Sequence, residues 1–267
     1  MIDLHCHILP GLDDGAQSIE ESLAMAKMAE EDGIEKIVAT PHFFRNDFLY
    51  KDFERVEIKR QELNLALEKN NIKVEILPGA EVHISHNLIN AIREHRDFLV
   101  LNHSSYMFVE FPSDHVFSGM KDLFFDLMSE GITPIVAHPE RNSVFMRNPE
   151  LLYELVQIGA LLQANSGSFS GLYGTTVQEG VHRFLELRLI HFIASDSHNI
   201  RSITPKLSGA LEKAEEILGK KEAYHLVEGN PLAVINNEEI PYLPEPINPS
   251  VNKKSLKMKI PKIFKHR

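Results

Sequence analysis

The sequence predicts an α/β fold in which parallel strands alternate with helices and close into a TIM-like barrel. Three observations support this prediction. Short apolar segments alternate with amphipathic helical patterns, which is typical of βα units and a parallel sheet. A chemically active side chain follows nearly every apolar segment, where barrels of this kind place their active-site residues. With 267 residues, the chain has a length that is common for a single barrel domain.

Seven segments have the apolar character of buried parallel strands. They are Ile2–His5, Lys36–Ala39, Lys73–Leu77, a strand within Phe98–Phe111, Thr133–Ala137, Ala160–Ala164 and Leu189–Ala194. Because each is followed by a helix or a loop and then by the next strand, we expect a seven-stranded (β/α)7 barrel in one domain.

Helical patterns fill the intervals between most of these strands. The clearest begins at Ser18, which forms a capping box with Glu21, and it ends before Gly33. The predicted helices are Ser18–Asp32, Tyr50–Asn70, His115–Glu130, Pro149–Ile158, Thr176–Leu187, Pro205–Leu218 and a short one near Glu222–Glu228. After Glu239 the sequence Pro-Tyr-Leu-Pro-Glu-Pro predicts an extended exit. We therefore assign residues 1–240 to the barrel and residues 241–267 to this exit and a basic tail.

The net charge of −10 is unevenly distributed along the chain. Residues 253–267 carry seven basic side chains and no acidic one. The rest of the chain has 21 basic and 38 acidic side chains, which is a net charge of −17. Such a body repels phosphate backbones, so we expect no nucleic-acid partner. The tail suits peripheral contact with an anionic membrane, although a solvated extension has the same composition.

The remaining composition favours a soluble, cytoplasmic protein. No apolar segment approaches the ~20 residues needed to span a bilayer, and the N-terminus lacks the pattern of a signal peptide. The single cysteine, Cys6, excludes an intrachain disulfide. Cys6 is also unsuited as a phosphatase nucleophile, because a Cys-x5-Arg loop requires arginine where this chain has Leu12.

Asp3-Leu4-His5-Cys6-His7 predicts a metal site at the end of the first strand. Alternate residues of a strand face the same way, so His5 and His7 can bind one ion with Asp3 behind them. Further nitrogen and oxygen ligands follow this strand and the later ones, namely Asp14, His42, Glu81, Glu110, His138, Asp196 and His198. This set exceeds the needs of one tetrahedral ion and predicts two or three ions that share a carboxylate such as Glu81. Ligands without thiolate suit manganese, iron or zinc.

The order of these motifs resembles the polymerase and histidinol phosphatase (PHP) superfamily. The resemblance rests on Asp-x-His-x-His, Thr-Pro-His, Gly-Ala-Glu-Val-His, Ala-His-Pro-Glu-Arg and Ser-Asp-Ser-His. Residues 1–16 are similar to the manganese-dependent protein tyrosine phosphatases of Gram-positive capsule and exopolysaccharide clusters. This resemblance extends to about residue 240. It implies a distorted seven-stranded barrel of PHP type, three metal ions with Mn²⁺ as the expected metal, and a tyrosine autokinase as the substrate.

The resemblance also implies three ligand sets. The first would contain His5, His7, Glu81 and Asp196, the second Glu81, Glu110 and His138, and the third Asp14, His42 and His198. Many members of the superfamily have a third histidine after the first motif, where this chain has Asp14. His103 competes with Glu110 for the second set.

The expected chemistry is hydrolysis of a phosphate ester by a hydroxide that bridges two metal ions. Arg141 and Arg201, each three residues after a histidine ligand, are placed to hold the phosphoryl group as planar donors. Surface ion pairs are the alternative role for both arginines. His83, Asp196 or a water molecule could protonate the phenolate leaving group.

The function that we expect is a metal-dependent protein tyrosine phosphatase acting on a membrane-associated autokinase that controls capsule or exopolysaccharide synthesis. A small-molecule phosphoesterase, such as a histidinol-phosphate phosphatase, is one alternative, and a non-catalytic, metal-stabilised kinase regulator is another. The aromatic residues Phe43, Phe44, Phe48 and Tyr50 either cradle the phosphotyrosine ring or pack a loop against the barrel.

Overall fold

The computed structural model describes residues 1–45, 53–85 and 87–250, and these ranges contain nine strands. The strands are β1 (Ile2–Cys6), β2 (Lys36–Ala39), β3 (His42–Phe43), β4 (Glu75–Pro78), β5 (Glu81–His83), β6 (Tyr106–Glu110), β7 (Thr133–Ala137), β8 (Leu161–Asn165) and β9 (Phe192–Ala194). They form two sheets, in the orders β1-β2-β4 and β3-β5-β6-β7-β8-β9, and every pairing between neighbours is parallel. The chain is therefore a single-domain α/β protein with parallel sheets.

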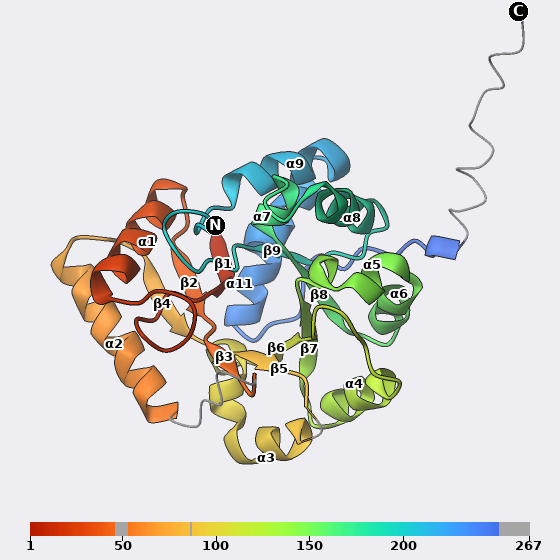
Figure 1. The fold of residues 1–267 in the computed structure, drawn as a ribbon, viewed down its shortest axis with the longest axis horizontal. Coiled ribbons are helices and arrows are strands. Elements are labelled where there is room, and N and C mark those ends of the chain that lie inside the picture. The colour runs from red at the N-terminus through yellow and green to blue at the C-terminus, as the bar shows by residue number, and fades with distance from the viewer. Residues whose placement is uncertain (46–52, 86, 251–267) are drawn as a thin grey trace, which may run out of the picture.

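Helices encircle these strands (Figure 1). The α-helices are α1 (Ile19–Glu31), α2 (Phe53–Lys69), α3 (Leu88–Leu99), α4 (Met120–Ser129), α5 (Ser143–Arg147), α6 (Glu150–Gln157), α7 (Ser166–Phe169), α8 (Thr175–Glu186), α9 (Ser208–Leu218), α10 (Lys220–Tyr224) and α11 (Asn230–Ile235). Two 3₁₀ turns, η1 (Leu101–His103) and η2 (Pro139–Arg141), and a π-helical turn, η3 (His225–Gly229), complete the described elements. The parallel strands and surrounding helices confirm the predicted α/β class.

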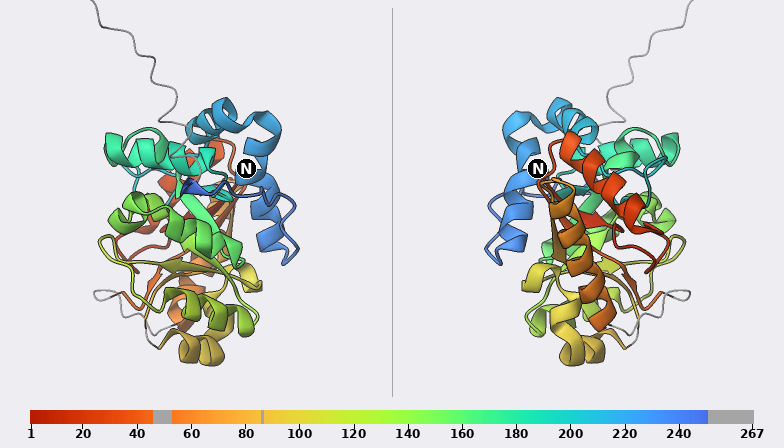
Figure 2. Two further views of the ribbon diagram at one scale, coloured as in Figure 1. Left: turned by 90° about the vertical axis from the view of Figure 1, so that its right-hand side faces the viewer. Right: turned by 90° about the vertical axis from the view of Figure 1, so that its left-hand side faces the viewer.

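The strands are buried on both faces, as expected for a parallel sheet. In β6, Phe108 packs in an inner apolar cluster that includes Val234 and Ile235 of α11, whereas Val109 packs in an outer cluster with the surrounding helices. The hydroxyl of Tyr106, at the start of β6, donates to the carbonyl of Glu238 at 2.7 Å. Helix α11 therefore covers the N-terminal ends of the strands, and Figure 2 shows it on one side of the molecule.

Two predicted strands are interrupted. Thr40 and Pro41 separate β2 from β3, and Gly79 and Ala80 separate β4 from β5. Proline cannot donate to a ladder, and a Cβ on Gly79 would lie 2.5 Å from Cγ1 of Val38. The short strands beyond these breaks pair with each other, which sets the two sheets apart.

Strand β1 contains a bulge that the alternation argument did not include. Asp3 pairs with Ile37 and Cys6 pairs with Ala39, so two residues of β1 oppose one residue of β2. Asp3 consequently does not lie behind the histidines. Its carboxylate accepts hydrogen bonds from the Ser195 hydroxyl at 2.5 Å and the Ser195 N–H at 2.9 Å. Oδ1 of Asp3 also accepts from the backbone N–H of His5 at 3.3 Å, so Asp3 contacts this predicted ligand through its backbone and not through its ring.

β1 is an edge strand of one sheet and β9 is an edge strand of the other, and the segment after β9 connects them by hydrogen bonds. The N–H of His7 donates to the carbonyl of Ser197, and the N–H of Asp196 donates to the carbonyl of His5, each at 2.8 Å. These bonds bring the C-terminal end of β1 against the first residues after β9.

Helix α3 was not predicted, although Leu88, Ile92 and Leu99 are buried on it at helical spacing. Its start signal is weak, because the Asn87 side chain makes no capping hydrogen bond, and its backbone is kinked at His95.

The capping box of α1 differs in detail. Ser18 accepts from the N–H of Glu21 as predicted, while the Glu21 carboxylate accepts from Gln17 N–H.

The described part of the chain after residue 240 remains in contact with the body. The backbone N–H of Tyr242 donates to the side chain of Asn230 at 3.1 Å, and the N–H of Ile247 donates to the carbonyl of Leu187 at 2.9 Å. The predicted boundary at residue 240 stays a prediction. The basic tail, Phe48 and Tyr50 lie outside the described residues. Within the described ranges, none of the helices combines the length and apolar character needed to cross a membrane.

Candidate metal centre

The predicted ligands gather at the C-terminal ends of the strands, on the side opposite α11. They come from β1, β3, β5, β6 and the segments that follow β1, β7 and β9. The buried members are His5, His7, His42, Glu81, Glu110, His138 and Asp196. Two of them have backbone angles in the left-handed region, His138 with φ of 30° and Asp196 with φ of 49°. Such strain in residues other than glycine is concentrated at functional sites.

The first ligand group contains His5, His7, Glu81 and Asp196, whose candidate ligand atoms lie within 4.8 Å of one another. The two Nε2 atoms of His5 and His7 are 3.3 Å apart. Oε2 of Glu81 is 3.3 and 3.4 Å from these nitrogens and 2.8 Å from Nδ1 of His42. Buried histidine nitrogens and carboxylate oxygens that converge in this way fit a shared metal ion.

The other ring nitrogen of each histidine is held by a residue that the sequence analysis did not single out. Nδ1 of His7 lies 2.7 Å from the carboxylate of Asp13, and Nδ1 of His5 lies 3.1 Å from Oε1 of Gln163. Such partners fix the ring and direct Nε2 toward the metal position. Asp13 directly precedes the predicted ligand Asp14, so the Asp-Asp pair in this loop could have indicated it. Gln163 is the one polar residue within the predicted strand Ala160–Ala164, and this was the signal that it offered.

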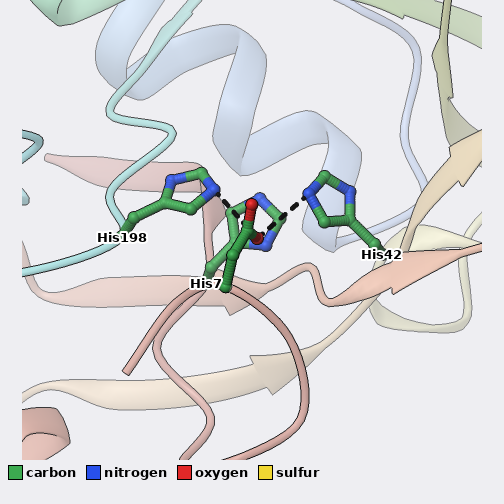
Figure 3. A group of neighbouring side chains, drawn as sticks. His7, His42 and His198 are labelled. Atoms are coloured by element: carbon green, nitrogen blue, oxygen red, sulfur yellow. Dashed lines mark ion pairs between the residues drawn. The ribbon is translucent and has the colours of Figure 1, made fainter. Parts of the chain in front are cut away.

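The second and third groups overlap the first. One contains His7, Asp14, His42 and His198, and the other contains His42, Glu81 and Glu110. In Figure 3 the rings of His42 and His198 approach one point from opposite sides, in front of His7. At that point Oδ1 of Asp14 lies 3.3 Å from Nε2 of His42 and 3.4 Å from Nε2 of His198. His7, His42 and Glu81 each belong to two groups, which is the sharing that a multi-ion centre requires.

These groups differ in part from the three sets that the resemblance implied. His42 joins Glu81 and Glu110, and His138 lies outside the three groups found among the described residues. Nε2 of His138 is 2.8 Å from Oε1 of Glu81, so it touches the same carboxylate. His103 is exposed in η1 and lines a separate pocket near Arg60. Of the two competitors for the second set, the structure brings Glu110, and not His103, to the cluster.

The ionisation of the cluster is mutually supported. Burial would raise the pKa of Glu81, but the rings of His5 and His42 hold this pKa well below its usual range. Burial would lower the pKa of His42, but the Glu81 carboxylate raises it to about 9. Burial would likewise lower the pKa of His7, but the Asp13 carboxylate raises it above its usual value. Because metal ions displace protons from such ligands, metal binding here would release protons.

Cys6 takes no part in this cluster. Its side chain packs in the outer apolar cluster with Met25 and Ala26 of α1. Burial raises the pKa of its thiol well above the ordinary value, which suppresses the reactive thiolate.

A hydrogen-bonded chain connects the ligands to Arg141. The Gln163 amide donates to Oδ1 of Asn165 at 2.9 Å, and the Asn165 amide donates to Oδ2 of Asp196 at 2.6 Å. Nη1 of Arg141 donates to the same oxygen at 2.8 Å. Glu140, which is fully buried, accepts from the backbone N–H of Asn165 at 2.8 Å. Strand β8 supplies no predicted ligand, yet its end organises Asp196 and Arg141.

A cavity of about 950 Å³ opens beside the cluster. Glu110, His138, His83 and Arg141 line it on the side of the ligands. Its apolar wall contains Phe44, Phe111, Phe117 and Phe145. Phe43, by contrast, is buried against Phe53, with ring centroids 5.3 Å apart. Of the two described residues of this aromatic run, Phe44 therefore lies at the cavity and Phe43 packs within the protein.

The remaining predicted residues differ in their placement. Nδ1 of His83 lies 3.1 Å from Oε2 of Glu110. Arg201 is exposed and is not among the residues that line the cavity. Arg45, which the sequence analysis did not single out, lines the cavity, and its Nη1 lies 2.7 Å from Nε2 of His42. Arg45 and Arg141 are thus the two arginines at the cavity in the part of the chain that the structure describes.

A parallel α/β fold with several overlapping ligand groups at the C-terminal ends of its strands has the architecture of metal-dependent hydrolases. Comparison with known families is more specific. The chain belongs to the CpsB/CapC family of capsular polysaccharide synthesis, whose profile matches residues 1–236.

Relatives in this family are similar over most of their length. The chain is 39% identical over 249 residues to the tyrosine-protein phosphatase YwqE of Bacillus subtilis (strain 168), covering 92% of this chain and 96% of the relative. It is 36% identical to the putative tyrosine-protein phosphatase CapC of Staphylococcus aureus, covering 75% and 78%. It is 30% identical to the tyrosine-protein phosphatase CpsB of Streptococcus pneumoniae, covering 90% and 100%.

Solved structures agree with this assignment. A crystal structure from work on YwqE and CpsB, described as metal-dependent tyrosine phosphatases, superimposes with a TM-score of 0.87 at 39% identity and covers 92% of this chain and 99% of its own. The β-aspartyl dipeptidase of Fervidobacterium islandicum superimposes with a TM-score of 0.55 at 15% identity, covering 88% of this chain and 74% of its own. At that identity the likeness concerns the fold alone.

Proposed function

We propose that this protein is a metal-dependent protein tyrosine phosphatase that serves capsular polysaccharide synthesis. One observation carries the proposal: overlapping histidine and carboxylate groups, joined through His7, His42 and Glu81, stand beside a cavity that combines Arg141 with an aromatic wall. The relatives named as tyrosine-protein phosphatases support the same activity. The capsule connection rests on the family to which the chain belongs.

The metal centre holds two to three ions, with Mn²⁺ as the metal that we propose and iron or zinc as alternatives. His138 is included because its Nε2 lies 2.8 Å from Oε1 of Glu81. The proposed ligands are therefore the nine predicted ones: His5, His7, Asp14, His42, Glu81, Glu110, His138, Asp196 and His198. When bound, such ions lower the pKa of water to about 7 and neutralise phosphoryl oxygens.

The protein's own side chains bind and orient the substrate. Arg141 has five N–H donors, of which the contact with Asp196 uses one, so it can also hold a phosphoryl oxygen. His83, held by Glu110, stands at the cavity and can return a proton to the leaving phenolate. Asp196 is the second side chain that we propose as a proton donor to the phenolate. Arg201 would have to reach the substrate from its exposed loop.

The substrate that we propose is a phosphotyrosyl protein, specifically a membrane-associated tyrosine autokinase. A phenyl ring can pack on Phe44, Phe111 and Phe117 in the cavity, which an aliphatic phosphate ester would leave uncovered. Histidinol phosphate is the competing small substrate, and its imidazole could use part of the same wall. Nucleic acid is disfavoured by the acidic body of the chain.

The test compares substrates at equal concentration with the Mn²⁺-loaded protein. We expect a phosphotyrosyl protein to be hydrolysed faster than histidinol phosphate, and single-stranded DNA not to be cleaved. Faster turnover of histidinol phosphate would replace the proposal by the small-molecule phosphoesterase. No turnover of any aryl phosphate with Mn²⁺, Fe²⁺ or Zn²⁺ would favour the non-catalytic regulator.

We further infer that the two sheets are parts of one distorted seven-stranded barrel of PHP type formed by residues 1–240. In this interpretation β2 with β3, and β4 with β5, are two interrupted strands. The N–H of Thr40 donates to Cys6 and the N–H of Glu81 donates to Pro41, at 3.0 and 3.1 Å, which supports continuity across both breaks. The bonds from His7 and Asp196 between β1 and the end of β9 support closure.

A further inference from the structure

Tyr173 has a buried hydroxyl group beside the side chains of Asn165 and Arg141. Its oxygen has almost no solvent contact and forms no aligned hydrogen bond with any residue that the structure describes. An unsatisfied buried hydroxyl destabilises a protein, so each one in a folded structure calls for an explanation. Neither the motifs in the sequence nor the proposed metal centre uses this residue.

The surroundings of this hydroxyl are the phosphoryl-binding side of the proposed site. Asp196 and Arg141 are its charged neighbours, and the side chain of Asn165 lies within reach of a hydrogen bond to it. The guanidinium carbon of Arg141 lies 4.6 Å from the centre of the Tyr173 ring, a cation–π arrangement that holds the two side chains together. Tyr173 therefore lies beside the arginine that we propose to bind phosphate.

The neighbouring polar groups are already engaged with one another. Oδ2 of Asp196 accepts from both Arg141 and Asn165, and Oδ1 of Asn165 accepts from Gln163. With these bonds in place, Asn165 is the neighbour that approaches the tyrosine hydroxyl, but the contact does not have the geometry of a hydrogen bond. A ligand with several acceptor oxygens, placed between Arg141 and the ligand cluster, would supply one.

The loop that carries Tyr173 is held in place by the protein. The N–H of Leu172 donates to the carbonyl of Gly167 at 3.0 Å, and the N–H of Gly174 donates to the carbonyl of Gly171 at 2.9 Å. The amide of Gln178 donates to the carbonyl of Phe169 at 2.8 Å. The hydroxyl is thus presented by an ordered turn between α7 and α8, which reduces the reorganisation needed on binding.

We propose that the Tyr173 hydroxyl is a further substrate-binding group of this site and donates a hydrogen bond to a phosphoryl oxygen beside Arg141. This proposal rests on the proposed phosphatase function. A tyrosine hydroxyl and a guanidinium side by side offer directional donors to an oxyanion, and donors of this kind act most strongly on the charge that develops in the transition state.

The decisive variant is Tyr173→Phe, which keeps the ring against Arg141 and removes only the hydroxyl. We expect kcat/KM for para-nitrophenyl phosphate to fall about 10- to 100-fold. The inhibition constant of orthovanadate should rise by a similar factor, while the metal content measured by elemental analysis stays unchanged. The matched control is Tyr106→Phe, which loses the hydroxyl contact with Glu238. Tyr106 lies at the N-terminal end of β6, away from the ligand Glu110 at its C-terminal end, so this variant should alter neither kinetic quantity.

The outcomes separate this inference from the proposed function. If the wild-type protein hydrolyses phosphotyrosine but Tyr173→Phe stays within twofold of it in both kcat/KM and vanadate inhibition, the hydroxyl has no role in binding. If the wild-type protein hydrolyses no phosphotyrosine, but orthovanadate binding measured by calorimetry weakens in Tyr173→Phe, the phosphatase proposal fails and the oxyanion contact stands.

Discussion

Glu81 is the residue on which the largest part of the candidate centre depends. It is fully buried, belongs to two ligand groups and touches His138 at 2.8 Å. We expect Glu81→Ala to lose more than one metal ion per chain, because two groups lose a shared carboxylate. His198→Ala should lose about one ion, since His198 belongs to a single group. Elemental analysis of the purified variants measures both values.

The wild-type protein provides the reference for this experiment. It should carry two to three transition-metal ions, and chelation should abolish activity until Mn²⁺ is restored. At most one ion per chain in active protein would contradict the multi-ion centre. Equal metal loss in the two variants would contradict the sharing role of Glu81.

Arg141 is expected to act on the rate and not on the metal content. Removing one donor that stabilises a developing oxyanion typically lowers the rate about 10²- to 10³-fold, so Arg141→Ala should lose this much kcat. Arg141→Lys should recover little, because an ammonium group cannot reproduce the planar fork or its stack on Tyr173. Steady-state kinetics with elemental analysis checks this. Wild-type kcat in Arg141→Ala would leave Arg141 a structural ion pair with Asp196.

The proposed metal ligands could be named from the sequence more readily than the residues that hold them in place. His5, His7 and Glu81 stand in short motifs at strand ends, where chemistry restricts the residue type. Asp13 and Gln163 support the histidine rings through contacts that depend on how a loop and a strand far along the chain fold back. No spacing rule connects His5 to Gln163, and the alternation rule named Asp3 in their place because the bulge was not visible in the sequence.

At the level of elements, the loop after β1 depends on a close backbone approach at Gly15. A Cβ at this position would lie 2.0 Å from the carbonyl oxygen of His7 and 2.5 Å from its Cβ. Gly15→Ala must therefore displace the loop that carries Asp13 and Asp14. We expect a loss of stability of about 1–3 kcal/mol and a clear fall in metal content and activity.

Thermal unfolding and elemental analysis test this expectation. The matched control is Gly209→Ala in α9, where an added Cβ meets no atom within 4 Å. This control should be neutral or slightly stabilising, because alanine has the higher helix propensity. A fully metal-loaded Gly15→Ala protein with wild-type melting temperature would show that the loop relaxes without cost.

The connection between β8 and β9 contains a pH-sensitive contact. His191 is buried, and its Nδ1 accepts from the backbone N–H of Leu162 at 3.1 Å. Burial lowers its pKa to about 4, below the value of about 6.5 for an unfolded chain. The contribution of neutral His191 to stability is therefore present above about pH 6.5 and is lost as the pH falls toward 4, by about 3 kcal/mol in total.

Urea unfolding between pH 7 and pH 4.5 measures this contribution. The wild-type protein should lose about 2–3 kcal/mol more unfolding free energy over this range than His191→Gln, which cannot titrate. The exposed His115→Gln variant is the control and should follow the wild-type curve, because metal ligands and other groups contribute equally to both. Parallel curves for wild type and His191→Gln would contradict the assignment.

At the scale of the whole molecule, the sequence was sufficient for the parallel α/β class and for most strand positions. The predicted strands Lys36–Ala39 and Thr133–Ala137 coincide with β2 and β7. The interruptions after β2 and β4 could not be predicted, because they arise from packing between strands, as at Gly79 and Val38. Helix α11, which covers the inner cluster, lacks a long amphipathic pattern and depends on tertiary contacts with Leu101 and Tyr106.

The uneven charge of the whole chain leads to a prediction about membranes. Residues 253–267, which lie outside the described residues, carry seven basic side chains, while the rest of the chain has a net charge of −17. Near an anionic surface each Lys or Arg contributes roughly 1 kcal/mol, whereas the acidic body opposes close approach. We expect a reversible attachment that weakens as salt rises. Deleting residues 253–267 should reduce sedimentation with phosphatidylserine vesicles at low salt.

The same deletion should leave hydrolysis of para-nitrophenyl phosphate unchanged, because residues between His5 and His198 supply the cavity lining and the three ligand groups found in the part of the chain that the structure describes. A chain in which the seven basic residues are replaced by glutamine controls for length, and it should lose vesicle binding as the deletion does. Vesicles of phosphatidylcholine should bind neither protein. If the full-length and shortened chains sediment equally with anionic vesicles at low ionic strength, the tail acts as a solvated extension and the prediction of membrane contact is wrong.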